Sequence, residues 1–424
     1  MKKDETLYDV AVVGGGPAGM MAAGRGAEMG AKVILIEKNE SLGKKLLITG
    51  GGRCNLTNAE FDTRKLLEKF KGDGKFLFSA FSRFSVTEAL DFFHKHGVET
   101  KIENEERVFP VSDDVRTVFN ALLKYMKRHK VEIILNSPAA QILISKDDKS
   151  EISGVKLKSG KEILARKVII ATGGISRPET GSTGDGFAWL RKIGHTIIEP
   201  TPSLVPIEVK DDWVKKLASL SLADIKITTL QNEVKQDTGR GKILFTHFGL
   251  SGPAILNMSK DIGELLKYGE VTISLDIFPS QDHGMLNAKL QEIFKERQNK
   301  KLKNSLSAII PSALASAVVE LSKINPEKQC NGITREERLA LVDILKNIPI
   351  RADKLLGSDK AIVSSGGVSL DEVDFKTMSS RLFPNLYLIG DILNISRPSG
   401  GYSLQLCWTT GFVAGNSAGN DHSL

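Results

Sequence analysis

The sequence predicts an α/β fold in which one domain, built on a parallel sheet, is interrupted by a β module and a helical module. Three observations support this. Residues 9–37 read as a strand, a glycine-rich turn, a helix and a second strand. Two apolar strands, 167–170 and 386–389, each run into small residues. The long stretch between them has a different pattern, so the first domain resumes only after an insertion.

The first of these segments has the spacing of a dinucleotide-binding fingerprint. Glycines fall at Gly14, Gly16 and Gly19, where the fold needs a tight turn, close approach to a pyrophosphate, and close helix–strand packing. The helix that begins at Pro17 points unpaired N–H groups at the phosphates. Glu37 ends the second strand, where a carboxylate accepts hydrogen bonds from the adenosine ribose. The segment therefore predicts a Rossmann-like βαβ unit.

Distant segments favour FAD over NAD as the nucleotide. The strand 167–170 runs into Ala-Thr-Gly-Gly, and the strand 386–389 runs into Gly390 and Asp391. Small residues there let the backbone approach a ligand at the carboxyl edge of the sheet. Gly400 and Gly401 precede an expected helix whose positive end suits a flavin, because reduction places negative charge near N1. The sequence predicts a glutathione-reductase-like domain with non-covalent FAD.

Five motifs carry a family resemblance. They are Gly-Gly-Gly-Arg-Cys-Asn-Leu-Thr-Asn at 50–58, Val-Phe-Pro at 108–110, Thr-Gly-Ser-Thr-Gly-Asp-Gly at 180–186, Phe-Thr-His-Phe-Gly-Leu-Ser-Gly-Pro at 245–253, and Gly-Gly-Tyr at 400–402. In this order they resemble the bacterial flavoproteins known as NAD(FAD)-utilising dehydrogenases or aminoacetone oxidase family FAD-binding enzymes. The resemblance covers nearly the whole chain. One group of that family is described as reducing conjugated double bonds of oxo-bile acids, an activity that the resemblance allows here.

The residues expected to bind FAD either let the backbone approach the ligand or offer it a polar side chain. They are Gly14, Gly16, Pro17, Ala18, Gly19, Glu37, Lys38, Lys44, Lys45, Gly51, Gly52, Arg53, Cys54, Asn55, Ala139, Ala171, Thr172, Gly173, Gly390, Asp391, Gly400, Gly401 and Tyr402. Asp391 is expected to accept a ribitol hydroxyl. Lys44 and Lys45 are expected to neutralise the pyrophosphate, the alternative being solvated loop charges.

Three positions after the glycine run have alternative interpretations. Arg53 pairs with a phosphate or with the flavin pyrimidine carbonyls, or else forms a surface ion pair. Cys54 is interpreted as a small buried residue near the ring, the alternative being a redox-active thiol. Asn55 and Asn58 either bond a flavin edge or serve turn and cap chemistry.

The candidate catalytic residues lie in the inserted β module. His247, between Thr246 and Phe248, is the one histidine in a motif-like setting and is the candidate for proton transfer to a substrate. Thr246 is the second candidate for substrate contact. The alternative for His247 is a packed histidine at a strand end.

The chain is expected to divide into four segments. Residues 1–195 and 355–424 form the FAD domain, 196–280 the β-rich module and 281–354 the helical module. Within the FAD domain we expect helices at 63–70, 85–96 and 115–126, a strand at 131–135, and a meander of runs near 139–145, 152–157 and 161–165. Strands at 204–209, 225–230, 242–245 and 271–278 make the β module, and a capping box at Thr334 and Glu337 begins a helix of the helical module.

Composition indicates a cytoplasmic enzyme. Lys and Arg exceed Asp and Glu by 7. The excess is concentrated near 289–303, which reads as a solvated helix face because no aromatic-rich nucleic-acid motif accompanies it. The three cysteines have no metal-ligand spacing and fit a reducing compartment. No signal peptide, membrane span or metal site is expected.

The leading function is an FAD-dependent oxidoreductase that moves a hydride between flavin N5 and a small organic substrate. NADH, NADPH or oxygen is the redox partner, and a nicotinamide would bind only transiently because no second GxGxxG unit occurs. Two alternatives stay open: an FAD-bound RNA-modifying or RNA-associated protein, and a flavin-binding scaffold without turnover. Nucleic acid is the less favoured partner.

Overall fold

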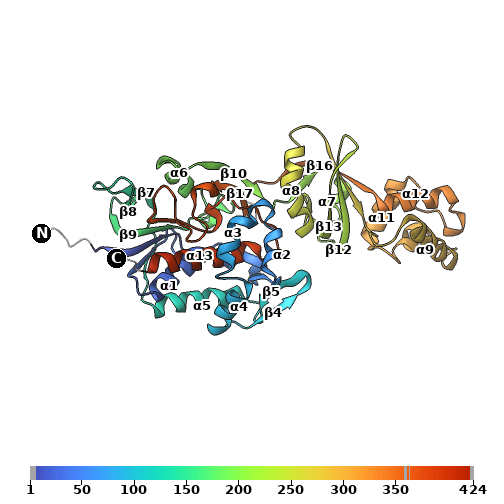
Figure 1. Ribbon diagram of the computed structural model, residues 1–424. Coiled ribbons are helices and arrows are strands. Elements are labelled where there is room, and N and C mark those ends of the chain that lie inside the picture. Colours follow the sequence, from blue (N-terminus) through green and yellow to red (C-terminus); the bar gives the residue numbers. More distant parts are fainter. Residues whose placement is uncertain (1–5, 358–360, 362, 421–424) are drawn as a thin grey trace. The chain divides into compact units, whose positions relative to one another are not determined.

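The computed structural model describes residues 6–357, 361 and 363–420. It divides into two compact units (Figure 1). Unit 1 consists of residues 1–203 and 361–424, and unit 2 of residues 204–360. The residues of unit 1 thus come from both sides of unit 2 in the sequence. None of the helices in the described residues is long and apolar enough to cross a membrane.

Unit 1 is built on a parallel sheet with the strand order β6–β2–β1–β9, and β18 pairs with β9 as well. The strands are β1 (Tyr8–Val13), β2 (Val33–Ile36), β6 (Glu132–Ile134), β9 (Glu162–Ile170) and β18 (Leu386–Leu388). Val13 is in register with Ile36 and Ile170, and Ile170 with Leu388. The carboxyl ends of four strands therefore meet at one edge, where ligands of such sheets bind. The predicted Rossmann-like α/β fold is confirmed.

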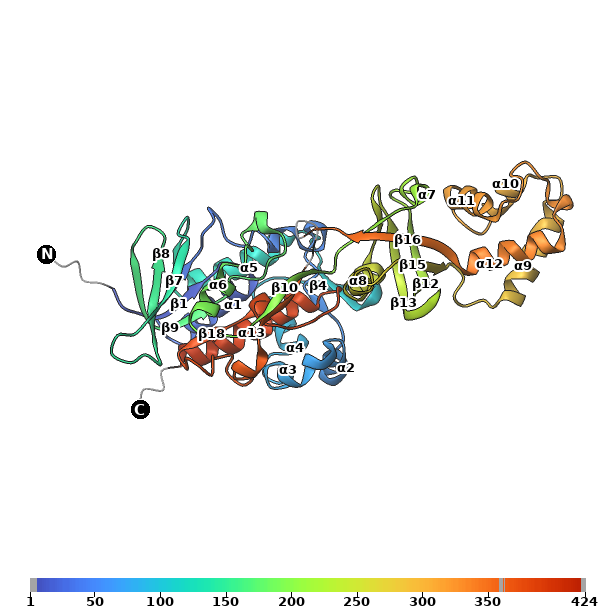
Figure 2. The same ribbon diagram turned by 90° about the horizontal axis from the view of Figure 1, so that it is seen from above.

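Two helices from opposite ends of the chain lie side by side in unit 1, α1 (Pro17–Glu28) and α13 (Tyr402–Gly419) (Figures 1 and 2). Three glycines of α13 face α1 at intervals of four residues. A Cβ atom at Gly411, Gly415 or Gly419 would lie 2.6, 2.5 or 2.7 Å from a backbone oxygen of α1. Glycine at these positions lets the two helices pack closely, with the middle of α13 against the start of α1.

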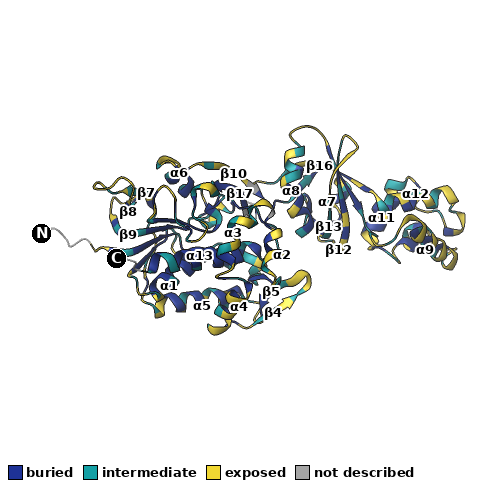
Figure 3. Cartoon of the chain, in the orientation of Figure 1, coloured by how far each residue is buried: buried dark blue, intermediate teal, exposed yellow. Residues whose placement is uncertain are grey.

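The remaining elements of unit 1 surround this sheet. They are η1 (Leu46–Gly52), β3 (Thr57–Asn58), α2 (Thr63–Glu68), η2 (Lys71–Asp73), α3 (Gly74–Phe81), α4 (Val86–Lys95), β4 (Thr100–Glu103), η3 (Asn104–Glu106), β5 (Arg107–Pro110), α5 (Val115–Arg128), β7 (Ala139–Ile144), β8 (Ile152–Leu157), η4 (Pro178–Thr180), α6 (Asp185–Lys192), β10 (Ile197–Ser203), β17 (Val363–Val368), η6 (Leu370–Glu372) and η7 (Gly390–Ile392). The amphipathic helix predicted at 115–126 is α5, which buries Val118, Leu122 and Met126 (Figure 3).

One predicted pair of strands is a single strand. The runs at 161–165 and 167–170 join in β9, which pairs with β8 in its first half and with β1 and β18 in its second half. The antiparallel meander is thereby attached to the parallel sheet through a shared strand. The break expected near residue 166 does not occur, because both halves have sheet partners.

Unit 2 contains a closed barrel with the strand order β11–β14–β13–β12–β15–β16. The strands are β11 (Ile207–Val209), β12 (Ser221–Gln231), β13 (Val234–Phe245), β14 (Gly249–Ser251), β15 (Val271–Asp276) and β16 (Ile348–Leu355), and the helices are α7 (Asp212–Lys215), α8 (Pro253–Leu265), α9 (His283–Glu296), α10 (Leu302–Leu306), α11 (Ser312–Ser322), η5 (Cys330–Gly332) and α12 (Arg335–Lys346). The capping box at Thr334 and Glu337 is present at the start of α12.

The unit boundaries differ from the predicted edges at 195 and 355. Strand β10 pairs with β17, and this pair belongs to unit 1. Strand β16 closes the barrel by pairing with both β11 and β15, so the segment 281–354 is not wholly helical. The β and helical modules form one compact unit, because the helices α9–α12 lie in the connection between two neighbouring barrel strands (Figure 2).

Candidate functional site

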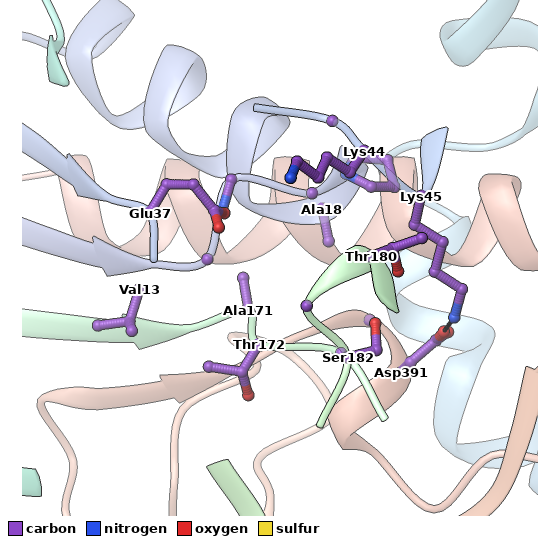
Figure 4. Close-up of a pocket in the computed structure, with 18 of the residues that line it drawn as sticks. Val13, Ala18, Glu37, Lys44, Lys45, Ala171, Thr172, Thr180, Ser182 and Asp391 are labelled. Carbon is purple, nitrogen blue, oxygen red and sulfur yellow. Dashed lines mark hydrogen bonds and ion pairs between the residues drawn. The ribbon is translucent and has the colours of Figure 1, made fainter. Parts of the chain in front are cut away.

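A pocket lies at the carboxyl edge of the parallel sheet in unit 1 (Figure 4). The space that no atom fills is about 1180 Å³, solvent at its mouth included, which suits a large ligand because ligand pockets span about 300–1,000 Å³. Of the residues predicted to bind FAD, the lining contains Gly14, Gly16, Pro17, Ala18, Glu37, Lys38, Lys44, Lys45, Ala139, Ala171, Thr172, Gly173, Gly390 and Asp391.

The three fingerprint glycines have different reasons to be glycine. Gly14 has φ +108°, and a Cβ there would lie 2.4 Å from the Ala171 oxygen; a Cβ at Gly19 would lie 1.9 Å from the Gly14 oxygen. Gly16 has φ −77°, which any residue adopts, and a Cβ there would meet nothing within 4 Å. The protein itself therefore does not require glycine at position 16. A pyrophosphate bound at the start of α1 would require glycine there, because a side chain at position 16 would occupy its space. The turn therefore fits a dinucleotide.

Glu37 and Thr172 also line the pocket. The Thr172 hydroxyl is buried without a hydrogen-bond partner and lies against Gly186, which is not among the lining residues. Glu37 marks one side of the pocket in Figure 4. Its carboxylate accepts hydrogen bonds from the N–H of Gly15 at 2.7 Å and from the N–H of Asn39 at 2.8 Å, which fixes its orientation.

On the opposite side of the pocket in Figure 4, Lys45 contacts Asp391. Lys45 Nζ lies 3.1 Å from the Asp391 carboxylate and donates to Ser176 Oγ at 2.6 Å. The guanidinium of Arg397 donates to the other Asp391 oxygen. Burial alone would raise the pKa of Asp391, but attraction to Arg397 and Lys45 outweighs burial and lowers it. Asp391 is therefore an ionised acceptor at this end of the pocket.

The pocket also contains residues that the sequence analysis did not select. Thr180, Gly181 and Ser182 line it, and Asn39 donates to the Thr180 oxygen at 3.1 Å. Lys38 holds the same segment through an ion pair, in which its Nζ lies 2.8 Å from the Asp185 carboxylate. The glycine-rich motif at 180–186 was the available signal, but its spacing does not match a known phosphate loop. Asn39, Ser403, Leu404 and Cys407 also line the pocket without a preceding signal.

Nine of the predicted FAD residues do not line the pocket. They are Gly19, Gly51, Gly52, Arg53, Cys54, Asn55, Gly400, Gly401 and Tyr402. The structure nevertheless brings the segments around 50–58 and 400–402 together. Asn58 Nδ2 donates to the Gly400 oxygen at 3.3 Å, and the Asn55 amide, oriented to satisfy both its ends, accepts from the Gly401 N–H at 3.1 Å. The two asparagines thus tie the segment 50–58 to the segment 400–402.

Arg53 forms surface ion pairs. Its guanidinium lies 2.5 Å from both Glu103 and Asp113, and it covers the ring of Phe109 at 4.2 Å from the ring centroid. This arrangement is the alternative to the expected contact with a phosphate or with the flavin. The predicted contact would require Arg53 to leave two carboxylates.

Cys54 has the properties of a buried structural residue. It is fully buried and lies in the left-handed region with φ +64°. Burial raises the pKa of its thiol to about 12. Since the thiolate is the reactive form, this thiol is unsuited to redox exchange at neutral pH.

The candidate catalytic residues belong to unit 2. Thr246 and Gly249 close a turn between β13 and β14, because the Thr246 N–H donates to the Gly249 oxygen at 2.8 Å and the Thr246 hydroxyl donates to the same oxygen at 3.0 Å. Thr246 therefore has a structural role. His247 and Phe248 form the tip of this hairpin, with ring centroids 4.8 Å apart, and His247 is exposed. His247 is not packed into the barrel.

This fold and this pocket are those of an FAD-dependent oxidoreductase. Within the described residues, no group of three or more His, Cys, Asp or Glu side chains is arranged to hold a metal. The chain belongs to the HI0933-like protein Rossmann domain family, whose model matches residues 8–417.

Relatives of known name cover nearly the whole chain. The 3-dehydro-bile acid delta(4,6)-reductase of Clostridium scindens is 30% identical over 96% of this chain and 98% of its own length. The ribosomal RNA dihydrouridine synthase of Escherichia coli is 28% identical over 96% of each chain. Among solved structures, a flavocytochrome c3 fumarate reductase is similar with a TM-score of 0.55 and 17% identity, covering 99% of this chain and 79% of that one. The last likeness concerns the fold alone.

Proposed function

We propose that the enzyme reduces a carbon–carbon double bond conjugated with a carbonyl group. The names of the two full-length relatives support this proposal. A delta(4,6) double bond beside a 3-oxo group and the C5–C6 bond of uracil beside its C4 carbonyl are bonds of this kind. When bound, FAD supplies the hydride that the β-carbon receives from N5. The protein must hold the cofactor, exclude water and deliver a proton to the α-carbon.

The pocket supports a particular assignment of cofactor parts to residues. Glu37 would hold the adenosine ribose, and the turn from Gly14 to Ala18 would hold the pyrophosphate, with Lys44 nearby. Asp391 would accept a ribitol hydroxyl. The segments 50–55 and 400–402, held together by Asn55 and Asn58, would surround the flavin ring, as would the start of α13, whose positive end stabilises negative charge.

The proton donor in this proposal is His247 rather than Thr246. The Thr246 hydroxyl is occupied by the hairpin turn. His247 is exposed at the tip of the hairpin, where functional residues are commonly carried by a rigid scaffold. An imidazole is also the side chain best suited to proton transfer near neutral pH.

NADH or NADPH is the proposed electron donor, as a transient co-substrate. The described strands of unit 2 pair only in the antiparallel sense, whereas a nicotinamide-binding Rossmann domain needs parallel βαβ units. The described residues of unit 2 therefore form no second domain of that kind. The dinucleotide would bind and leave at the flavin, and oxygen is the alternative partner.

We infer a small cyclic enone as the substrate class, because the bile-acid reductase is 30% identical to this chain over 98% of its own length. A uridine in RNA is the second candidate, supported by the name of the Escherichia coli relative. The exposed lysines Lys295 and Lys300 on unit 2 are available to a polyanion. This basic surface is modest, so we rank RNA second.

The test is anaerobic. Holoenzyme is mixed with NADH and then NADPH, and loss of the visible absorbance of the flavin identifies the donor. The reduced enzyme is then mixed with a 3-oxo-Δ4 steroid acid or with unmodified ribosomal RNA. We expect the enone to reoxidise the flavin and to yield the saturated ketone by mass spectrometry. Reoxidation by RNA alone would favour the second candidate, and reoxidation by neither would contradict the proposed reaction.

A further inference from the structure

Three loops that are far apart in the sequence meet at the side chain of Lys45. Lys45 follows β2, Ser176 follows β9, and Asp391 follows β18. The ammonium group donates to Ser176 Oγ at 2.6 Å and to the Asp391 carboxylate at 3.1 Å. Ser176 is fully buried, and the side chains of Lys45 and Asp391 are 21% and 11% exposed. One lysine therefore joins three strand ends at the rim of the pocket.

Arg397 holds Asp391 from the other side. Its side chain is 1% exposed. It donates to the Asp391 carboxylate, to the Ile395 oxygen at 2.7 Å and to Ser403 Oγ at 3.1 Å. Ser403 lies in the first turn of α13 and lines the pocket, as Asp391 does. A single guanidinium thus orients two residues of the pocket wall at once, through the several donors that arginine offers.

The charge of Asp391 depends on these two cations. An isolated carboxylate this deeply buried would bind a proton, because burial disfavours the ionised form. Arg397 and Lys45 reverse this effect and lower the pKa of Asp391. The other titratable group beside it is Cys407, whose pKa burial raises to about 12, with the charge of Asp391 adding to the rise. Cys407 therefore stays neutral, and the cluster carries one net positive charge.

We propose that Lys45 and Arg397 are positioning residues that keep Asp391 ionised and oriented as the acceptor for a ribitol hydroxyl of FAD. This inference rests on the proposed location of the ribitol and not on the identity of the substrate. An ionised acceptor makes a stronger hydrogen bond than a neutral carboxyl group. The two cations thereby make retention of FAD insensitive to pH across the physiological range.

The experiment measures the dissociation constant of FAD by flavin fluorescence on the full-length chain, from about pH 8 to about pH 5, which lies above the ordinary aspartate pKa of about 3.9. The wild-type protein should give a flat profile. Lys45→Met removes one cation, so burial should raise the pKa of Asp391 into this range. Below that pKa, affinity should fall, by at most about tenfold for each pH unit, towards the affinity of Asp391→Asn. Lys45→Arg retains the charge and should restore the flat profile.

Asp391→Asn provides the matched control. It should bind FAD more weakly than the wild type but with no pH dependence, and the double variant Lys45→Met/Asp391→Asn should also give a flat profile. Circular dichroism at each pH separates unfolding from loss of FAD. A flat profile for Lys45→Met would overturn the inference, as would pH dependence that survives in the double variant. Wild-type affinity in Asp391→Asn would show that Asp391 does not contact FAD. None of these results depends on whether an enone is reduced.

Discussion

The carboxylate of Glu37 accepts a hydrogen bond from the backbone N–H of Gly15 at 2.7 Å. This contact joins the end of β2 to the glycine turn that follows β1. Glu37 is only 6% exposed, so its orientation is set before any ligand binds. The acid and the turn therefore form one preorganised wall of the pocket. Of the three turn glycines Gly14, Gly15 and Gly16, only Gly16 has free space where a Cβ atom would be.

Gly16→Val should abolish FAD binding while the protein stays folded. A branched side chain would occupy the space that a Cβ at Gly16 enters without touching protein, which is the space a pyrophosphate needs. The measurement is flavin absorbance of the purified protein beside its thermal unfolding midpoint. Gly72→Val is the matched control, since Gly72 is exposed, lies outside the pocket, and would also have no protein atom within 4 Å of a Cβ. Full flavin content in Gly16→Val would contradict the assignment.

Unit 1 should bind FAD without unit 2. Every residue that lines the pocket belongs to unit 1, and Ser203 is paired in register with Val363. A linker of about four Gly and Ser residues can therefore replace residues 204–362, because hairpin loops of two to about five residues are common. We expect a folded protein with bound FAD and no substrate turnover. A folded but colourless protein that ignores added FAD would show that unit 2 supplies part of the site.

His247→Ala should leave FAD occupancy unchanged and slow substrate reduction by about 10²–10⁴-fold, the usual contribution of a general acid or base. Reduction of the flavin by the electron donor should be unaffected, so stopped-flow measurement of the two half-reactions separates the effects. Thr246→Val is the comparison: it removes the hydroxyl that bonds Gly249 and should lower the unfolding midpoint. An unchanged substrate step in His247→Ala would remove His247 from the mechanism.

Buried His195 should make stability fall as the solution becomes acidic. Its Nδ1 lies 2.9 Å from Glu372 and its Nε2 lies 3.0 Å from Ser380 Oγ. Burial lowers the pKa of His195 more than Glu372 raises it. The unfolded chain, with a histidine pKa of about 6.5, therefore binds the proton more readily, so the free energy of unfolding decreases as the pH falls through about 6.5.

Urea unfolding at several pH values tests this relationship. His195→Gln should be less stable at about pH 8 but should show a weaker dependence on pH between about 7 and about 5. His94→Gln, which changes an exposed histidine, should retain the wild-type dependence. If the free energy of unfolding changed equally with pH in the wild type, His195→Gln and His94→Gln, His195 would be excluded as the titrating group.

Cys54 should not react with thiol reagents in the native protein. With a pKa of about 12, roughly one thiol in ten thousand is ionised at about pH 8, and the side chain is fully buried. Alkylation followed by mass spectrometry should label Cys54 only after unfolding. Cys54→Ala should keep the rate of flavin reduction by the donor. Rapid native labelling together with a lost reduction step would restore the redox interpretation.

The fold class, the cofactor and much of the pocket could be predicted from the order of residues alone. Gly14, Gly16 and Gly19 are predictable because a tight turn, a close ligand and a close helix each exclude a side chain, and this leaves a fixed spacing. Glu37 and Asp391 are predictable because strand ends at one edge of a parallel sheet place their next residues together. These are local constraints, and a local constraint leaves a pattern of residues that can be recognised in the sequence.

The remaining features depend on contacts between distant parts of the chain. Arg397 was not selected, because its role depends on contacts with Asp391 and Ser403 that no spacing reveals. Arg53 was expected at the cofactor, but it is paired on the surface with Glu103, which ends β4, and with Asp113, which follows β5. Strand β16 closes the barrel by pairing with β11 and β15, although the helices α9–α12 separate it from β15 in the sequence. Periodicity therefore could not show that β16 belongs to the barrel. Pairings between residues distant in the chain depend on how the whole chain packs, and that packing leaves no local pattern.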